Sequence, residues 1–127
     1  MKQILLVFVV LILVAPPMEA QSFPKTAGEF ANSCKDLEPE RAVNDPSAAM
    51  VNGFCLGFMN GLLVSNRLFL DMKRGAPFFC APQAVTPGQA AQIFVKYMND
   101  HPEKLHEGAP VMVMVSLMAA FPCNKPD

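Results

Sequence analysis

The sequence predicts an all-α fold, a small four-to-five-helix bundle linked by two disulfides. Apolar residues recur at helical spacing along most of the chain, and four cysteines, an even number, follow an export signal. The one run that would also suit a strand has no second strand candidate to pair with. The helical spacing and the missing strand partner favour helices over a sheet, and the cysteines predict the disulfides.

Residues 1–20 are predicted to be a secretory signal peptide. The start is positively charged, residues 4–15 form an uncharged run too short to span a bilayer, and the small residue Ala20 ends the segment. We expect cleavage after Ala20, which leaves residues 21–127 as a single domain in the periplasm with no stable membrane insertion. Met18 is large for its position before the cut, so an uncleaved anchor is the alternative.

The expected mature domain carries almost no net charge. Removing the signal peptide takes one basic residue, Lys2, and one acidic residue, Glu19, from the chain's 10 basic and 11 acidic residues. A nucleic-acid-binding domain would show a basic stripe, which is not visible in this sequence. We therefore expect no nucleic-acid partner.

The first helix is expected from Thr26 onward. Ala27, Phe30, Ala31 and Cys34 follow the i, i+3, i+4, i+7 spacing that places residues on one face of an amphipathic helix. A polar segment that contains proline follows, which predicts a loop.

The central helix is predicted to begin near Pro46. Asp45 is a suitable N-cap, and proline is favoured at the first helical position. The main stretch of this helix, residues 51–70, is apolar over most of its surface, so we expect it to be buried.

Glycine recurs at every fourth residue of this helix, at Gly53, Gly57 and Gly61. Successive helical residues are rotated by about 100°, so Cys55 points almost opposite to Gly57. We expect a covalent partner on the cysteine side and a closely packed neighbour on the glycine side. Such stripes also occur in transmembrane dimers, but polar residues in the same stretch, such as Asn60, favour a soluble core helix.

A loop of about 15 residues, 71–85, is predicted after the central helix. It contains Gly75, Pro77 and Pro82 and shows no sustained hydrophobic period. Loops of this length in compact domains are often functional.

The third main helix is predicted from a capping box. Thr86 is placed at the N-cap, Pro87 at the first helical position and Gln89 at the third. We expect the helix to end near Asp100, because His101 precedes a proline and is pushed out of the helical region.

One further turn can form within residues 102–106, and residues 111–121 are predicted to be the last helix. Alternating Val and Met would also suit a strand, but no strand partner exists. This helix is apolar on nearly all sides, which suggests more apolar surface than a monomer of this size covers. A homodimer is therefore expected.

Two disulfides are predicted among Cys34, Cys55, Cys80 and Cys123. The sequence alone allows three connectivities, and a zinc site is disfavoured because there is no CxxC pair and only two histidines are present. If the third and last helices are antiparallel neighbours, Cys123 lies near Cys80, and the first helix meets the central one through the other two cysteines. We therefore predict the pairs Cys34–Cys55 and Cys80–Cys123.

No catalytic constellation is found, so we expect no enzyme activity, metal or cofactor. His101 and His106 do not converge on one continuous helix, and the run HPEKLH lacks the HExxH arrangement. The serines lack a nucleophile-elbow context, and disulfide-bonded cysteines are not nucleophiles. The nine methionines are expected to fill the core, with a Met-rich binding face as the alternative.

Several short motifs resemble a known family. They are C-x-G-F-x-x-G at 55–61, F-C-x-P at 79–82, T-P-G-Q at 86–89, YMNDHPE at 97–103 and A-F-P-C at 120–123. Together with the cysteines they resemble the Rap/Tai group, small periplasmic proteins that protect bacteria against amidase effectors of type VI secretion. The resemblance covers residues 30–123 and implies an all-helical, disulfide-bonded, usually dimeric inhibitor of a peptidoglycan-cleaving enzyme.

A second function class is a periplasmic stress-related binding protein. It would resemble the acid-stress chaperones of the HdeA type, which are also small, helical, dimeric and disulfide-linked. Two histidines and an ordinary number of carboxylates supply no special pH trigger, which weighs against the chaperone.

For the inhibitor, the part of this loop from Asp71 to Phe79 is the expected partner-binding segment. It is long, carries two cations beside a proline and an aromatic residue, and is anchored at its end by a cysteine. The residues expected to bind the effector are Asp71, Lys73, Arg74, Pro77 and Phe78. An ordinary connection between helices is the alternative.

Overall fold

The computed structural model describes residues 23–37, 44–72 and 76–123, and within these ranges it contains helices and no strand. The helices are α2 (Ala27–Cys34), α4 (Pro46–Asp71), α5 (Pro87–Asp100), the short 3-10 helix η1 (Pro102–Lys104) and α6 (Ala109–Ala120). The predicted all-α fold class is therefore confirmed. The predicted signal peptide, residues 1–20, lies outside the described residues.

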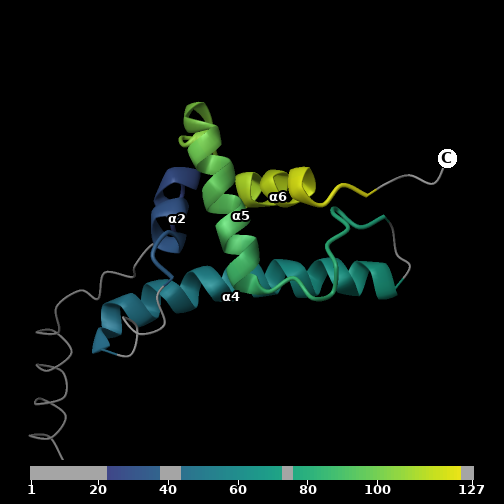
Figure 1. Cartoon of the computed structure of the whole chain (residues 1–127), viewed down its shortest axis with the longest axis horizontal. Coiled ribbons are helices and arrows are strands. Elements are labelled where there is room, and N and C mark those ends of the chain that lie inside the picture. Colours follow the sequence, from purple (N-terminus) through teal and green to yellow (C-terminus); the bar gives the residue numbers. More distant parts are fainter. Residues whose placement is uncertain (1–22, 38–43, 73–75, 124–127) are drawn as a thin grey trace, which may run out of the picture.

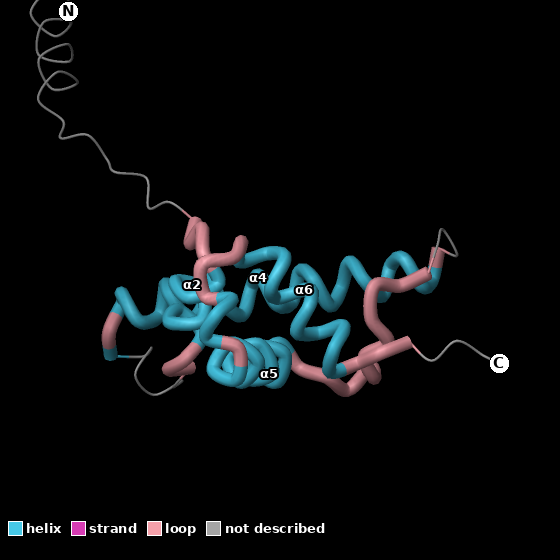
Figure 2. The backbone as a smooth tube through the Cα atoms, turned by 90° about the horizontal axis from the view of Figure 1, so that it is seen from above, coloured by secondary structure: helices cyan, strands magenta, loops and turns pink. Residues whose placement is uncertain are grey.

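The long helix α4 forms the base of the molecule as drawn in Figure 1, and α5 crosses it steeply. Helix α2 lies on one side of α5 and α6 extends from the other. In Figure 2, α5 is seen nearly end-on while α4 is seen from the side. The antiparallel arrangement of the third and last helices that was assumed in pairing the cysteines differs from the structure, in which α5 and α6 cross at a steep angle (Figure 1).

Short-range caps set the helix starts. The Thr26 hydroxyl accepts from the backbone N–H of Glu29 at 3.2 Å, and the Glu29 carboxylate accepts from the N–H of Thr26 at 3.1 Å. Thr86 and Gln89 form the same capping box at α5, and Asp45 caps α4. The predicted starts of the central and third helices are confirmed.

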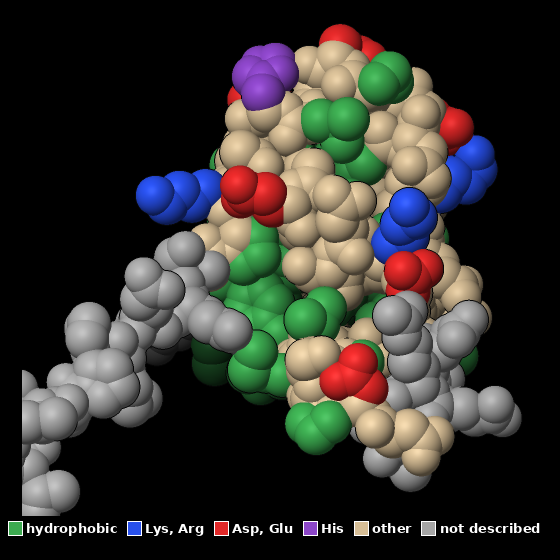
Figure 3. Space-filling model, turned by 90° about the vertical axis from the view of Figure 1, so that its left-hand side faces the viewer, with side chains coloured by type: hydrophobic (Ala, Val, Ile, Leu, Met, Phe, Trp, Pro, Cys, Tyr) green, Lys and Arg blue, Asp and Glu red, His purple; other side chains and the backbone are tan. Residues whose placement is uncertain are grey.

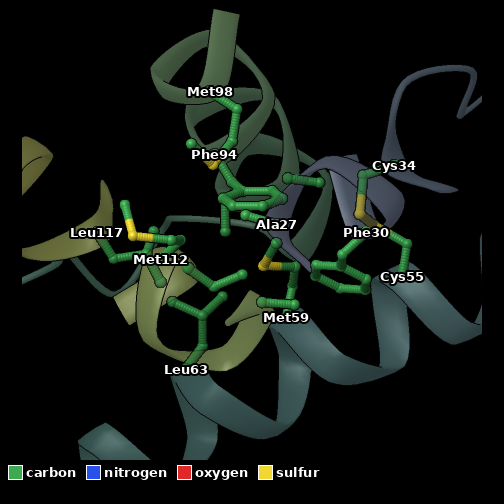
Figure 4. Close-up of a cluster of buried hydrophobic side chains, with 14 of the residues drawn as sticks. Ala27, Phe30, Cys34, Cys55, Met59, Leu63, Phe94, Met98, Met112 and Leu117 are labelled. Atoms are coloured by element: carbon green, nitrogen blue, oxygen red, sulfur yellow. A yellow bond between two sulfur atoms is a disulfide. The ribbon is translucent and has the colours of Figure 1, made fainter. Parts of the chain in front are cut away.

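The core lies where α2, α5 and α6 meet the inner side of α4 (Figure 4). Phe30 of α2 is fully buried, and its ring centroid lies 5.1 Å from that of Phe58 and 5.5 Å from that of Phe94. Such tilted and edge-to-face aromatic contacts add to the burial of apolar area. The largest fully buried side chains are Phe30, Phe79, Phe94, Met59, Met98 and Leu117.

Both predicted disulfides are present. Cys34–Cys55 joins α2 to α4 inside the core, with a Cα–Cα distance of 5.5 Å. Cys80–Cys123 joins the loop after α4 to the segment after α6, with a Cα–Cα distance of 4.9 Å. The pairing is thus as predicted although the helix arrangement differs, because the loop itself carries Cys80 to the end of α6.

The segment before α2 is tied to the connection between η1 and α6. Thr26 and Gly108 form an isolated antiparallel bridge. The N–H of Ala27 donates to the carbonyl of Glu107 at 2.8 Å, and the N–H of Ala109 donates to the carbonyl of Lys25 at 3.1 Å. The start of α2 and the start of α6 are therefore held together by backbone hydrogen bonds.

Helix α4 is not a buried helix, and this prediction is wrong. Among its residues only Cys55, Met59, Leu63 and Asn66 are buried. Only 22% of its most apolar 18-residue window lies inside the protein. The other described elements pack on one side of α4, so its apolar residues on the opposite side face solvent.

The glycine stripe lies on this open side. An added Cβ at Gly53, Gly57 or Gly61 would meet no atom within 4 Å. Cys55 is buried and Gly57 is exposed, as their opposite directions on the helix predict. The predicted close neighbour at the glycines is therefore not found in the described part of this chain.

Candidate functional site

The candidate site is the loop between α4 and α5. Of its predicted partner-binding residues, Asp71 ends α4 and is exposed, Pro77 is partly buried, and Phe78 is 53% exposed. Lys73 and Arg74 lie outside the described residues. The structure thus places Phe78 on the surface of the loop and leaves the two cations as sequence-based predictions.

Asn66 of α4 fixes the backbone of this loop from beneath. Its side chain is only 4% exposed. The amide nitrogen donates to the carbonyl of Phe79 at 2.7 Å, and the amide oxygen accepts from the N–H of Phe78 at 3.0 Å and from that of Phe79 at 3.4 Å. The Asn66 side chain therefore provides hydrogen-bond partners for both the N–H and the carbonyl of the buried residue Phe79, as buried polar groups require.

Arg67, the next residue of α4, holds the later part of the loop. Its guanidinium donates to the carbonyl of Gln83 at 2.7 Å and reaches the carbonyl of Val85 at 3.5 Å. A charged donor to a carbonyl forms a stronger hydrogen bond than a neutral one. Consecutive residues of one helix thus shape both halves of the loop.

The loop also has a covalent anchor. The N–H of Cys80 donates to the carbonyl of Phe121 at 2.9 Å, next to the Cys80–Cys123 disulfide. The loop segment is therefore fixed at one end to α4 and at the other to the end of α6.

Phe78 and Phe79 point in opposite directions from this fixed backbone. Phe79 is fully buried and packs in the core, whereas the Phe78 ring lies at the surface. Its centroid is 5.9 Å from that of Phe69 on α4, with the rings at 88°. Phe69 is also exposed, so the two rings form an outward-facing aromatic pair beside the loop.

Sequence reasoning missed Asn66 and Arg67 as loop-positioning residues. A signal for Asn66 exists, because it continues the inward-facing series of Cys55, Met59 and Leu63 at helical spacing. A polar residue in such a series must find a buried partner. The sequence does not show that this partner is the backbone of Phe78 and Phe79.

His101 and Lys104 both contact Tyr97 near the end of α5. The His101 ring stacks on that of Tyr97 at 4.1 Å, and its Nδ1 donates to the Tyr97 carbonyl at 2.8 Å, which satisfies an acceptor at the end of α5. Lys104 donates to the Tyr97 hydroxyl at 3.1 Å, and this hydrogen bond raises the pKa of Lys104. In the ranges that the structure describes, no three His, Cys, Asp or Glu residues are grouped to hold a metal.

These features define a small, disulfide-linked helical protein that presents a fixed loop with an exposed aromatic pair. Residues 26–123 match the family of Rap1a immunity proteins, and the chain belongs to that family. The resemblance found in the sequence motifs is therefore confirmed. No curated protein and no solved structure matches the chain.

Proposed function

We propose that this protein is a periplasmic immunity protein that binds and blocks a peptidoglycan amidase effector of type VI secretion. Membership of the Rap1a immunity family over residues 26–123 is the observation that carries the proposal. An immunity protein acts by binding a protein partner. The proposed partner-binding segment is the loop from Asp71 to Phe79.

The loop geometry supports this assignment. Asn66 holds the backbone at Phe78 and Phe79, and Cys80 holds it two residues after Phe78, so little conformational freedom remains to be lost there on binding. Active sites of enzymes are concave and lined by apolar groups with a few polar ones. An exposed aromatic side chain on a fixed loop is a suitable anchor for such a pocket. In this proposal, Lys73 and Arg74, which precede the anchor by a few residues in the sequence, contribute positive charge to the binding segment.

Export to the periplasm is part of the proposal. The first 20 residues have the features of a signal peptide, and disulfides persist in oxidising compartments such as the periplasm. All four cysteines are paired in the structure. We also propose a homodimer, which the family resemblance implies.

The test is binding of the mature protein to a type VI amidase effector encoded in the same genome. Replacing Lys73, Arg74 and Phe78 together with alanine is expected to weaken binding by at least about 30-fold, since loss of one anchor residue costs about 2 kcal/mol or more. The control is Met118→Ala, an exposed apolar residue on α6. Unchanged affinity of the triple variant would dispose of the loop assignment.

An acid-stress chaperone is the second candidate, and the exposed apolar side of α4 favours it. A chaperone of this kind should keep client proteins soluble at low pH. Light scattering of an aggregating client at low pH, with and without the protein, separates the candidates. Protection of the client together with no binding to any amidase effector would favour the chaperone.

A further inference from the structure

The two disulfides differ in their exposure to solvent. Cys80 and Cys123 are both exposed, whereas Cys34 is 3% and Cys55 is 0% exposed. The buried pair joins α2 to α4, and Figure 3 shows apolar side chains gathered low on the end of the molecule that holds α2 and the start of α4. The exposed pair lies towards the other end of α4, where the loop after α4 meets the segment after α6 (Figure 1). A reagent in solution can therefore reach the exposed pair without opening the core.

Exposure decides how readily a disulfide reacts, because a thiolate must reach one of its sulfur atoms. Exposed disulfides are the labile and regulatory ones in folded proteins. Residues 72–95 and 108–126, which carry the exposed pair, contain no Asp or Glu, and their cations are Lys73, Arg74 and Lys125. The attacking thiolate and the leaving sulfur are both negatively charged, so positive charge in the flanking sequence favours the reaction.

The exposed disulfide holds one end of the partner-binding segment. Cys80 follows Phe79 directly and lies two residues after Phe78, the proposed anchor. Its N–H also donates to the carbonyl of Phe121 at 2.9 Å. When the covalent bond is broken, this exposed end of the segment is held to the end of α6 by a hydrogen bond with which water can compete. Asn66 still holds the segment from α4, so opening the disulfide loosens Phe78 without unfolding the domain.

We propose that Cys80–Cys123 is a site of thiol–disulfide exchange that controls the partner-binding segment. While the bond is intact, Phe78 is held in place for the effector. Once a protein dithiol has reduced the bond, Phe78 is less well ordered, and the cost of ordering it on binding weakens the affinity for the effector. This inference rests on the proposed function, because the segment it controls is the one assigned to the effector.

The exchange consumes one dithiol for each disulfide. A thiolate of the dithiol attacks the sulfur of Cys80 or Cys123, the S–S bond breaks, and the other cysteine leaves as a thiolate. The second thiol of the dithiol loses its proton and attacks its neighbour in the mixed disulfide, which releases the remaining cysteine. The two cysteines take up the two protons of the dithiol, and the dithiol is oxidised to a disulfide. The reverse reaction restores the bond.

The first test is calorimetric titration of a type VI amidase effector from the same genome with the mature protein before and after opening of the bond. Mild dithiothreitol opens it, iodoacetamide blocks the thiols, both reagents are removed, and peptide mass spectrometry confirms that only Cys80 and Cys123 are labelled. The treated wild type is expected to bind about 10-fold more weakly, since ordering a short segment on binding costs about this much. The matched control carries Cys80→Ser and Cys123→Ser, and it should bind about 10-fold more weakly both before and after the same treatment.

A second test needs no effector. Amide hydrogen exchange, followed by mass spectrometry, should become faster after the treatment in peptides that contain Phe78 and Phe79. Peptides of α2 should keep the exchange rate of the untreated protein, because Cys34–Cys55 remains closed. This comparison also shows that the treated protein is still folded.

Unchanged effector affinity of the treated wild type, or a double serine variant that binds as tightly as the untreated wild type, would overturn the proposal. Unchanged exchange in the Phe78 peptides, or equal acceleration in α2, would also overturn it. An untreated wild type that binds no amidase effector contradicts the proposed function instead, and the exchange measurement then still tests control of the segment by the disulfide. The two failures therefore give different results.

Discussion

The side-chain amide of Asn66 donates to the backbone carbonyl of Phe79 at 2.7 Å, from a position that is almost completely buried. This hydrogen bond joins the inner side of α4 to the loop that the proposed function assigns to the effector. The same side chain accepts from the N–H of Phe78, the residue proposed to contact the partner. Helix and loop are therefore one rigid unit at this point.

Asn66→Ala is expected to lower the free energy of unfolding by about 1–3 kcal/mol, because it leaves buried backbone groups without partners. It should also weaken effector binding, since the Phe78 backbone is no longer held. Urea unfolding followed by circular dichroism gives the first quantity and calorimetric titration the second. Asn60→Ala, on the exposed side of the same helix, should change stability by no more than about 0.5 kcal/mol. Equal effects of the two substitutions would contradict the role of Asn66.

The adjacent Phe78 and Phe79 should separate binding from stability. Phe79→Ala is expected to cost about 3–5 kcal/mol of stability, because this side chain is fully buried. Phe78→Ala removes an exposed ring and should leave the urea midpoint nearly unchanged while it reduces effector affinity. A Phe78→Ala variant that unfolds as readily as Phe79→Ala would show that the outward ring has a structural role.

The two disulfides should differ in reactivity. Cys80 and Cys123 are exposed, whereas Cys34 and Cys55 are buried. Mild dithiothreitol followed by iodoacetamide under native conditions should therefore label Cys80 and Cys123 first, as read by peptide mass spectrometry. Simultaneous labelling of all four cysteines would indicate that the core opens as easily as the loop.

Removing the Cys80–Cys123 bond should also destabilise the protein. The two cysteines are 43 residues apart. The chain-entropy model assigns a loop of this length about 4 kcal/mol. The double variant with serine at both positions, compared with the wild type by urea unfolding, measures this contribution. A difference below about 1 kcal/mol would mean that the loop is held by Asn66 and Arg67 without the disulfide.

Stability should fall in acid partly through Glu29. The backbone N–H of Thr26 and then that of Lys25 donate to its carboxylate and hold its pKa below the usual value of 4.5. A carboxylate whose pKa is lower in the folded than in the unfolded state stabilises the folded protein at pH values above its pKa in the unfolded state. This contribution is lost as the pH falls through the pKa of the carboxylate in the folded state.

Glu29→Gln should therefore be less stable than the wild type at pH 7, with a difference that shrinks below about pH 4. Urea midpoints between pH 7 and pH 3 measure this difference. Glu103→Gln, outside the capping box, serves as the control. A constant difference across the whole range would exclude the carboxylate charge as the cause.

The features that the sequence predicts correctly are local or covalent. Threonine and aspartate caps with the following prolines mark the starts of α4 and α5, because capping depends only on residues a few positions apart. The disulfide pairs are also predicted correctly, although the helix arrangement assumed for them is not the one observed.

The burial of α4 is not predictable in the same way. Apolar composition shows which surface can be buried, but whether another element covers it depends on the packing of the whole domain. Residues 51–70 are apolar over most of their surface, but the buried ones lie on the side of Cys55 and Met59. The role of Asn66 was missed for a related reason, since its partners are 12 and 13 residues away along an irregular loop.

The most direct test of the central claim is the rate of peptidoglycan cleavage by a purified type VI amidase effector from the same genome, measured with increasing amounts of the mature protein. The proposed function predicts complete inhibition near one immunity chain per effector chain, with the Lys73, Arg74 and Phe78 triple variant much weaker and Met118→Ala unchanged. Full amidase activity in the presence of excess wild-type protein, for every such effector in that genome, would contradict it.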